Sequence, residues 1–285
     1  MSALPLRAIE VAPRDRTGET AVDCVHGVPR RAAIVAMLGV AATACGGGGS
    51  DTATPMAGTV QSRSLAARSN GTTYPLFVYL PPGGAAVLAT LPVVVLLDGD
   101  SRFATLVEIV EATQARVIVV GIGNEFLRAR DYVPANLCTA GGGGHAAFLD
   151  FIRFDLIPFV ETAFGGDPLR RVLLGHSHGG SFVLYALFAE ADAGRHFRAY
   201  LASDASIGCM SDTVYGWESA YAAANAGLAG RLHIAYAGNV ANAPFAAQIQ
   251  GRRHAGLTVA VQAYNGGHIG MIPAAFADAL AFALA

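Results

Sequence analysis

The stretch RRVLLGHSHGGSFVLYALF, residues 170–188, passes from an apolar, strand-like run into a helical one through the sequence GHSHG at residues 175–179. A serine on such a sharp connection, with glycines where backbone segments must come close, is typical of a nucleophile elbow. The helix that follows would direct the positive end of its dipole at the serine and favour an oxyanion there. The stretch therefore predicts that Ser177 is a nucleophile at the carboxyl end of a strand.

Strand-like and helical patterns alternate on both sides of this stretch. We expect strands at about residues 59–66, 74–80, 92–97, 116–122, 171–175, 198–202, 231–237 and 257–263, and helices over 145–164, 181–191, 215–228, 241–253 and 272–285. The turn-forming run Ser69-Asn70-Gly71 indicates an antiparallel hairpin between the first two strands. The rest of the alternation predicts an α/β protein with a mainly parallel, eight-stranded sheet and helices on both faces.

Length and composition limit the classes of function. The chain has 285 residues, of which 53% are hydrophobic and 14% charged, and its net charge is −2. Such a chain can bury one large core, so residues 57–285 are expected to form a single catalytic domain. Because no basic run could neutralise a row of phosphates, nucleic acid is not an expected partner. The sequence also lacks an apolar run of 18 residues, so no membrane-spanning helix is expected in the mature protein.

The N-terminal part reads as a processing signal. Residues 30–45 consist of two arginines, a short apolar stretch ending in small residues, and Cys45, which resembles the lipobox of bacterial lipoproteins. Residues 1–29 would then be a mis-annotated extension, and residues 46–56 a Gly-rich flexible tether. The resemblance implies that a lipid on Cys45 anchors the protein in the cell envelope facing the periplasm, and Gly46 favours the outer membrane. An ordinary signal peptide and an apolar helix with a chance cysteine remain alternatives.

Two of the four cysteines, Cys138 and Cys209, fall in the exported domain. An oxidising compartment permits a disulfide between them, and two buried free thiols are the alternative. Both positions lie in segments expected at the carboxyl edge of the sheet. A bridge there would fasten the rim of the active site.

His268 is the best candidate for the general base. It lies in NGGHIG at residues 265–270, directly after the last expected strand, where the chain order of the α/β-hydrolases places the histidine. His145, beside a glycine run, is the second candidate. The flanking His176 and His178 are poor candidates, because residues next to a serine on a tight elbow diverge from it.

The acid that should orient this base is not assigned. The loop after the penultimate expected strand contains no Asp or Glu. Asn239 in that loop could orient the histidine through its amide oxygen, or a serine–histidine dyad could operate. Asp204 and Asp212, in the loop after the preceding strand, are weaker options.

Backbone N–H groups near the serine are expected to form the oxyanion hole. His178, the residue after the nucleophile, would supply one donor. The second would come from Gly99 or Asp100 in the segment LLDGDSRF, although an ordinary Asp-Gly turn is an equal alternative. His176 and His178 lack a third convergent ligand, so neither a metal nor a cofactor is expected.

The segment after the fourth expected strand contains charged residues that should overhang the site. Arg128, Arg130 and Asp131 lie there. One of the arginines could bind an anionic group of the substrate or assist the oxyanion. A structural ion pair between Arg130 and Asp131 is the alternative.

With these residues in place, the chain resembles the esterase D-like family of α/β-hydrolases and, within it, the siderophore trilactone esterases. The matching pieces are YPLFVYLPPG (74–83), PVVVLLDGD (92–100), VVGIGN (119–124), RARDYVP (128–134), GGGGHAAFLDFIRFDLIPFVE (141–161), DPLRRVLLGHSHGGSFVLYALF (167–188) and NGGHIG (265–270). The resemblance implies an α/β-hydrolase fold and an ester-cleaving serine hydrolase, with Ser177 and His268 catalytic and Arg130 as an oxyanion or substrate contact. The family's acid after the penultimate strand is missing, and SDASIGCMSD (203–212) replaces an aromatic-rich segment that lines the pocket.

The resulting hypothesis is a serine esterase that acts on a small-molecule ester, possibly a siderophore lactone, through an acyl-enzyme on Ser177. Acyl transfer from the same intermediate is one alternative. A non-catalytic siderophore-binding envelope protein is another. The sequence does not decide the acyl length or the oligomeric state.

Overall fold

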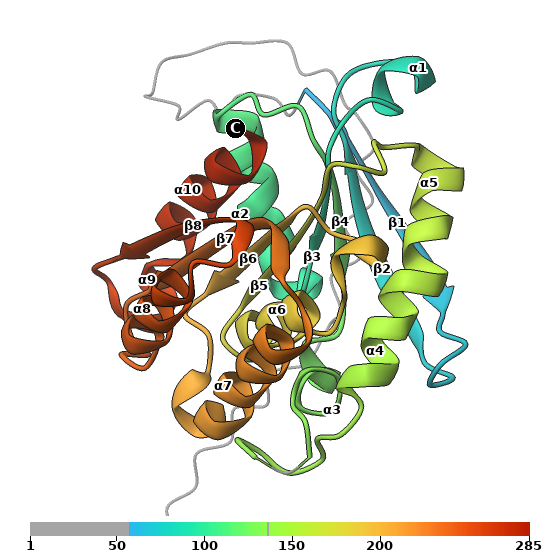
Figure 1. Ribbon diagram of the computed structural model, residues 1–285. Coiled ribbons are helices and arrows are strands. Elements are labelled where there is room, and N and C mark those ends of the chain that lie inside the picture. The colour runs from blue at the N-terminus through green and yellow to red at the C-terminus, as the bar shows by residue number, and fades with distance from the viewer. Residues whose placement is uncertain (1–56, 136) are drawn as a thin grey trace, which may run out of the picture. The chain divides into compact units, whose positions relative to one another are not determined.

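The computed structural model describes residues 57–135 and 137–285, shown in Figure 1. The predictions for residues 1–29, for the signal peptide with Cys45 and for the tether 46–56 fall outside the described residues.

One eight-stranded sheet organises the described residues, in the order β1-β2-β4-β3-β5-β6-β7-β8. The strands are β1 (Thr59–Ala66), β2 (Thr73–Leu80), β3 (Val93–Leu96), β4 (Ile118–Ile122), β5 (Arg171–His176), β6 (Ala199–Ser203), β7 (Gly227–Tyr236) and β8 (Ala255–Ala263). β1 and β2 form the expected antiparallel hairpin, and β2 also pairs antiparallel with β4. All pairs from β4 to β8 are parallel. The predicted fold class is therefore confirmed.

The central strands are apolar on both faces because helices cover both faces. Every residue of β3, β4 and β6 is buried, as is typical of parallel strands between two helical layers. Helices α2 (Gly99–Ala112) and α10 (Ile272–Leu284) pack on one face, where Val94 and Leu96 point. The helices α4 (His145–Phe151), α5 (Ile157–Phe164), α6 (His178–Phe188), α7 (Ile207–Ala224) and α8 (Asn242–Arg252) cover the other face (Figure 1).

Short helical segments complete the connections between these elements. They are α1 (Ala85–Leu88), η1 (Glu125–Leu127), α3 (Arg128–Tyr132), η2 (Ile152–Leu156), η3 (Asp192–Gly194) and α9 (Gly267–Gly270). Among the described residues, none of the helices has the length and apolar character that crossing a bilayer requires.

α2 and α7 differ from the sequence-based expectation. α2 was not predicted, because Asp98-Gly99-Asp100 reads as a turn, yet the left-handed Asp98 (φ 53°) leads directly into the helix. The helix predicted over 215–228 begins earlier, at Ile207, and ends at Ala224, since Leu228 belongs to β7.

The long helix expected over 145–164 is present, but it consists of α4, the π-helical η2 and α5 in succession. Pro158 lies in the first turn of α5. A proline inside an α-helix cannot donate the hydrogen bond to the carbonyl four residues earlier, and its ring clashes with that carbonyl. The wider π turn before it accommodates this residue without ending the helix.

Candidate active site

Ser177 lies on a strained turn between β5 and α6. Its backbone angles are φ 61° and ψ −122°, a conformation that residues other than glycine rarely adopt. A Cβ on Gly175 would lie 2.4 Å from the carbonyl oxygen of Gly179, so the turn requires a glycine there. The N–H of Ser177 donates to the carbonyl oxygen of Ser203 in the next strand, at 2.9 Å. These features are those of a nucleophile elbow at the carboxyl end of β5.

His268 lies beside this elbow, in the short helix α9 after β8. Its Nδ1 is 2.6 Å from Oδ2 of Asp204. Its ring centroid is 4.5 Å from that of His176, the residue directly before Ser177. The side chain is 39% exposed, so the ring is open to solvent and substrate. With Nδ1–H donating to the carboxylate, Nε2 is left as the acceptor that a general base needs.

Asp204 occupies the place of the acid that the sequence left unassigned. It follows the last residue of β6 in the left-handed conformation (φ 42°), and it is fully buried. Its carboxylate accepts the N–H groups of Ala237, Gly238 and Asn239 at 3.0, 3.1 and 3.0 Å. Burial raises the pKa of Asp204, but the hydrogen bonds from His268 and from these N–H groups outweigh it and hold the pKa below its ordinary value. Asp204 is therefore an anion behind His268.

The remaining candidates for the acid and for the base do not contact His268 or Ser177 in the way that those roles require. The amide of Asn239 donates to the carbonyl oxygen of Asp204 at 2.9 Å, so Asn239 supports the acid rather than contacting the histidine. Asp212 lies exposed in α7. His145, the second candidate for the base, has its ring 4.6 Å from that of Tyr185 in α6.

The flanking histidines contact serines other than Ser177. Nδ1 of His176 is 3.0 Å from Oγ of Ser203, and Nδ1 of His178 is 2.9 Å from Oγ of Ser206. Ser206 was missed by the sequence analysis, and its Oγ is also 3.3 Å from Oγ of Ser177. Among residues 57–135 and 137–285, no group of three or more metal-ligating side chains is found.

Burial lowers the pKa of His176 to about 3, with the nearby His268 and Arg102 acting in the same direction. The folded protein therefore binds fewer protons than the unfolded chain between about pH 6.5 and 3, so stability falls as the pH falls through this range. One such group contributes at most ~1.4 kcal/mol per pH unit. We expect His176→Asn to lose less stability than the parent protein between pH 7 and 5 in urea unfolding. An equal loss in both proteins would contradict this assignment.

Arg128, rather than Arg130, reaches the elbow. Nη2 of Arg128 donates to Oδ2 of Asp98 at 3.0 Å and to the carbonyl oxygen of His176 at 3.2 Å. Burial raises the pKa of Asp98 to about 6, and Arg128 opposes this shift. Arg130 instead donates to the buried Asp131 at 2.7 Å and to the hydroxyl of Tyr74 at 2.9 Å. Of the two expectations for Arg130, the structure therefore shows the structural ion pair with Asp131.

The expected oxyanion donors lie at two helix N-termini. Gly99 and Asp100 open α2, and His178 opens α6. The first N–H groups of a helix have no acceptor within that helix. Both helices start where a parallel strand ends, so their N-termini lie at the same edge of the sheet. The role of these N–H groups remains a prediction.

A disulfide joins Cys138 to Cys209, with their Cα atoms 5.3 Å apart. This is the pair of cysteines that the sequence suggested. The bridge connects the segment between α3 and α4 to the first turn of α7. The sulfur of Cys209 lies 3.4 Å from the carbonyl oxygen of Ser206, so the bridge lies next to the residues around the nucleophile.

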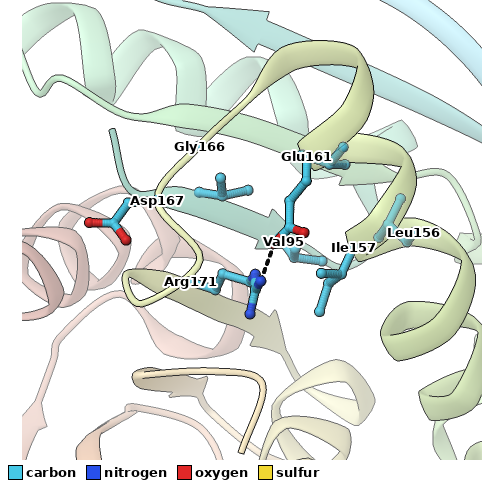
Figure 2. A pocket seen from close by; sticks show the side chains of 9 residues that line it. Val95, Leu156, Ile157, Glu161, Gly166, Asp167 and Arg171 are labelled. Atoms are coloured by element: carbon cyan, nitrogen blue, oxygen red, sulfur yellow. Dashed lines mark hydrogen bonds and ion pairs between the residues drawn. The ribbon is translucent and has the colours of Figure 1, made fainter. Parts of the chain in front are cut away.

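Figure 2 shows a small apolar cavity at the opposite edge of the sheet. Val93 and Arg171, which line it, are the first residues of β3 and β5, whereas Ser177 follows the last residue of β5. Arg171 is paired there with Glu161 (Figure 2). The cavity is therefore separate from the chemistry at Ser177.

An elbow serine with a histidine–aspartate pair at the carboxyl edge of such a sheet is the arrangement of the α/β-hydrolases. Comparison with known families agrees, because residues 67–228 match the family described as "Putative esterase". The match covers more than half of the chain, so the protein belongs to this family, as the sequence resemblance predicted.

Individual relatives define the branch more closely. The chain is 32% identical to the ferri-bacillibactin esterase BesA of Bacillus subtilis over 185 residues, which are 56% of this chain and 62% of BesA. It is 34% identical to the siderophore triacetylfusarinine C esterase of Aspergillus fumigatus over 133 residues, 41% of this chain and 44% of the relative. The chain thus spans less than two thirds of the length of either curated relative.

A similar solved structure is the IroE-like serine hydrolase from Shewanella oneidensis. It has a TM-score of 0.71 and 26% sequence identity, and the match covers 78% of this chain and 79% of that one.

Proposed function

We propose that the protein is a serine esterase that hydrolyses carboxylic esters through an acyl-enzyme on Ser177. The observation that carries this proposal is the 2.6 Å contact between His268 and the buried Asp204 beside an elbow serine. A histidine oriented in this way by an anion is the base that a serine nucleophile requires.

In the proposed reaction, the hydroxyl of Ser177 turns about its Cα–Cβ bond toward Nε2 of His268. His268 takes the proton while Oγ attacks the carbonyl carbon of the ester, and Asp204 stabilises the resulting imidazolium. Collapse of the tetrahedral intermediate breaks the bond to the alcohol oxygen, which receives the proton from His268. A water molecule then gives a proton to His268 and attacks the acyl carbon. Collapse of this second intermediate breaks the bond to Ser177 Oγ, which takes the proton back from His268 as the acid leaves.

The oxyanion of each intermediate would be stabilised by the N–H of His178 and by Gly99 or Asp100 at the start of α2. Arg128 adds a positive charge at the same edge, where its guanidinium already touches the carbonyl oxygen of His176. A positive group so close to the elbow favours an anionic intermediate or an anionic substrate.

The substrate class that we propose is a siderophore ester. The names of two curated relatives, a ferri-bacillibactin esterase and a siderophore triacetylfusarinine C esterase, support it. The segment 203–212, which supplies Asp204 and Ser206 and includes the start of α7, departs from the family pattern, so it is expected to determine which ester is accepted.

We also propose that the protein is a periplasm-facing lipoprotein of the bacterial envelope, anchored through Cys45. The support is the sequence of residues 30–45. Radiolabelled palmitate should be incorporated into the full-length chain and lost in Cys45→Ser. Retention of the label in Cys45→Ser would contradict the proposed anchor.

The test of the catalytic proposal combines labelling with turnover. A fluorophosphonate should modify the protein once, and peptide mass spectrometry should place the adduct on Ser177. The protein should also open a catecholate trilactone and cleave a short p-nitrophenyl ester to free acid. An unlabelled protein that binds the trilactone without turnover would instead indicate a siderophore-binding protein, and acyl product in an added alcohol would indicate an acyltransferase.

A further inference from the structure

The hydroxyl of Ser177 contacts a second serine–histidine pair, which the reaction above does not use. Ser206 Oγ lies 3.3 Å from Ser177 Oγ and 2.9 Å from Nδ1 of His178. Ser206 is 8% exposed, as is Ser177. In this conformation the Ser177 hydroxyl is hydrogen-bonded to Ser206, and among the described residues no hydrogen bond joins it to His268.

Backbone contacts fix Ser206 in this position. Its N–H donates to the carbonyl oxygen of Ser177 at 3.2 Å, so the two serines are joined through both backbone and side chain. Ser206 also directly precedes the first residue of α7. Three residues later, Cys209 holds the same turn through its disulfide with Cys138. The Ser206 hydroxyl is therefore held against the nucleophile by the fold.

The direction of these hydrogen bonds depends on the tautomer of His178. Burial lowers the pKa of His178, and the positive charge of Arg128 lowers it further, so the ring is neutral at neutral pH. A neutral imidazole can accept a hydrogen bond at Nδ1. When the proton of the neutral ring is on Nε2, Nδ1 accepts from Ser206 O–H and the oxygen of Ser206 accepts the O–H of Ser177. In this arrangement the proton of Ser177 points toward Ser206.

We propose that Ser206, held by His178, is a positioning residue that keeps the Ser177 hydroxyl turned away from His268 until an ester occupies the site. This inference rests on the proposed esterase function. The free enzyme must break the Ser177–Ser206 hydrogen bond before Ser177 can give its proton to His268. Removal of the acceptor should make the nucleophile of the free enzyme more reactive.

The test measures the second-order rate constant for reaction with a fluorophosphonate. Since a neutral hydrogen bond contributes about 0.5–1.5 kcal/mol, we expect Ser206→Ala to react about two- to tenfold faster than the parent protein. Ser206→Thr keeps the hydroxyl and should restore the parent rate. Ser181→Ala is the matched control, because Ser181 is a buried serine of α6 whose Oγ has no hydrogen-bond partner among the described residues. Its rate should not change.

A general loss of structure would slow the reaction, so the expected rise separates positioning from packing. An unchanged or lower rate in a folded Ser206→Ala protein would overturn the inference. If that variant does not fold, His178→Phe provides the second measurement, since it keeps the backbone N–H and removes the acceptor for Ser206. The rate of labelling of His178→Phe should also rise. An unchanged or lower rate in this variant overturns the inference. A parent protein that is not labelled at Ser177 would refute the proposed function and this inference together, whereas a labelled parent with unaltered variants refutes only the inference.

Discussion

Ser177→Ala is expected to lower kcat/KM for a short p-nitrophenyl ester by at least ~10⁴-fold, because the acyl-enzyme cannot form without the nucleophile. The variant should remain folded, since alanine keeps the Cβ and the N–H that bonds to Ser203. Steady-state rates of ester cleavage, corrected for uncatalysed hydrolysis, provide the measurement.

Two comparisons make this result specific. Ser181→Ala removes a hydroxyl one turn further along α6 and should retain the parent rate. His268→Ala should be impaired to a similar degree as Ser177→Ala, and the double variant should lose little more, because the two groups act as a unit. Activity in Ser177→Ala within tenfold of the parent would exclude Ser177 as the nucleophile.

Asp204→Asn is expected to reduce kcat by about 10³- to 10⁴-fold with little change in KM. Asparagine replaces the anion that stabilises the imidazolium, and its amide can present N–H₂ instead of an acceptor to His268. The carboxylate also accepts three backbone N–H groups, so the thermal midpoint should fall as well. Measuring kcat well below that midpoint separates the two effects.

Asp212→Asn is the matched control for this substitution. Asp212 is an exposed carboxylate of α7, eight positions further along the chain, and the same chemical change there should leave kcat unchanged. An Asp204→Asn protein with parent activity would show that His268 works as part of a dyad.

The sheet could be predicted from the sequence because its strands are locally marked. β3 to β6 are short apolar runs between turn residues. They are apolar because both faces of these strands are buried under helices. α2 was missed because turn residues precede it, although its buried Phe103, Leu106, Val107 and Val110 have helical spacing; the left-handed Asp98 before it could not be predicted. Conformations of this kind are imposed by packing rather than by local preference.

For the site, the sequence predicted the residues that a motif marks, ranked Asp204 only as a weaker option for the acid, and missed Ser206. Ser177 and His268 each lie in a glycine-flanked motif at a strand end. Asp204 follows a different strand from the one where such acids are usual, and its approach to His268 depends on the lateral pairing of β6 with β7. Ser206 carries no motif, and its contact with Ser177 depends on the path of the chain into α7.

The position of Asp204 also alters which mutations the neighbouring loop can tolerate. The loop after β7 supplies N–H groups of its main chain to the carboxylate, and N–H groups are common to all residues except proline. The hydrogen bond to the acid therefore places no requirement of its own on the side chain at Ala237. Gly238 is the exception, because a Cβ there would lie 3.1 Å from Asp204 Oδ2 and 3.2 Å from the Cβ of His268. In homologues with the same acid, a glycine is therefore expected to persist at the centre of this loop.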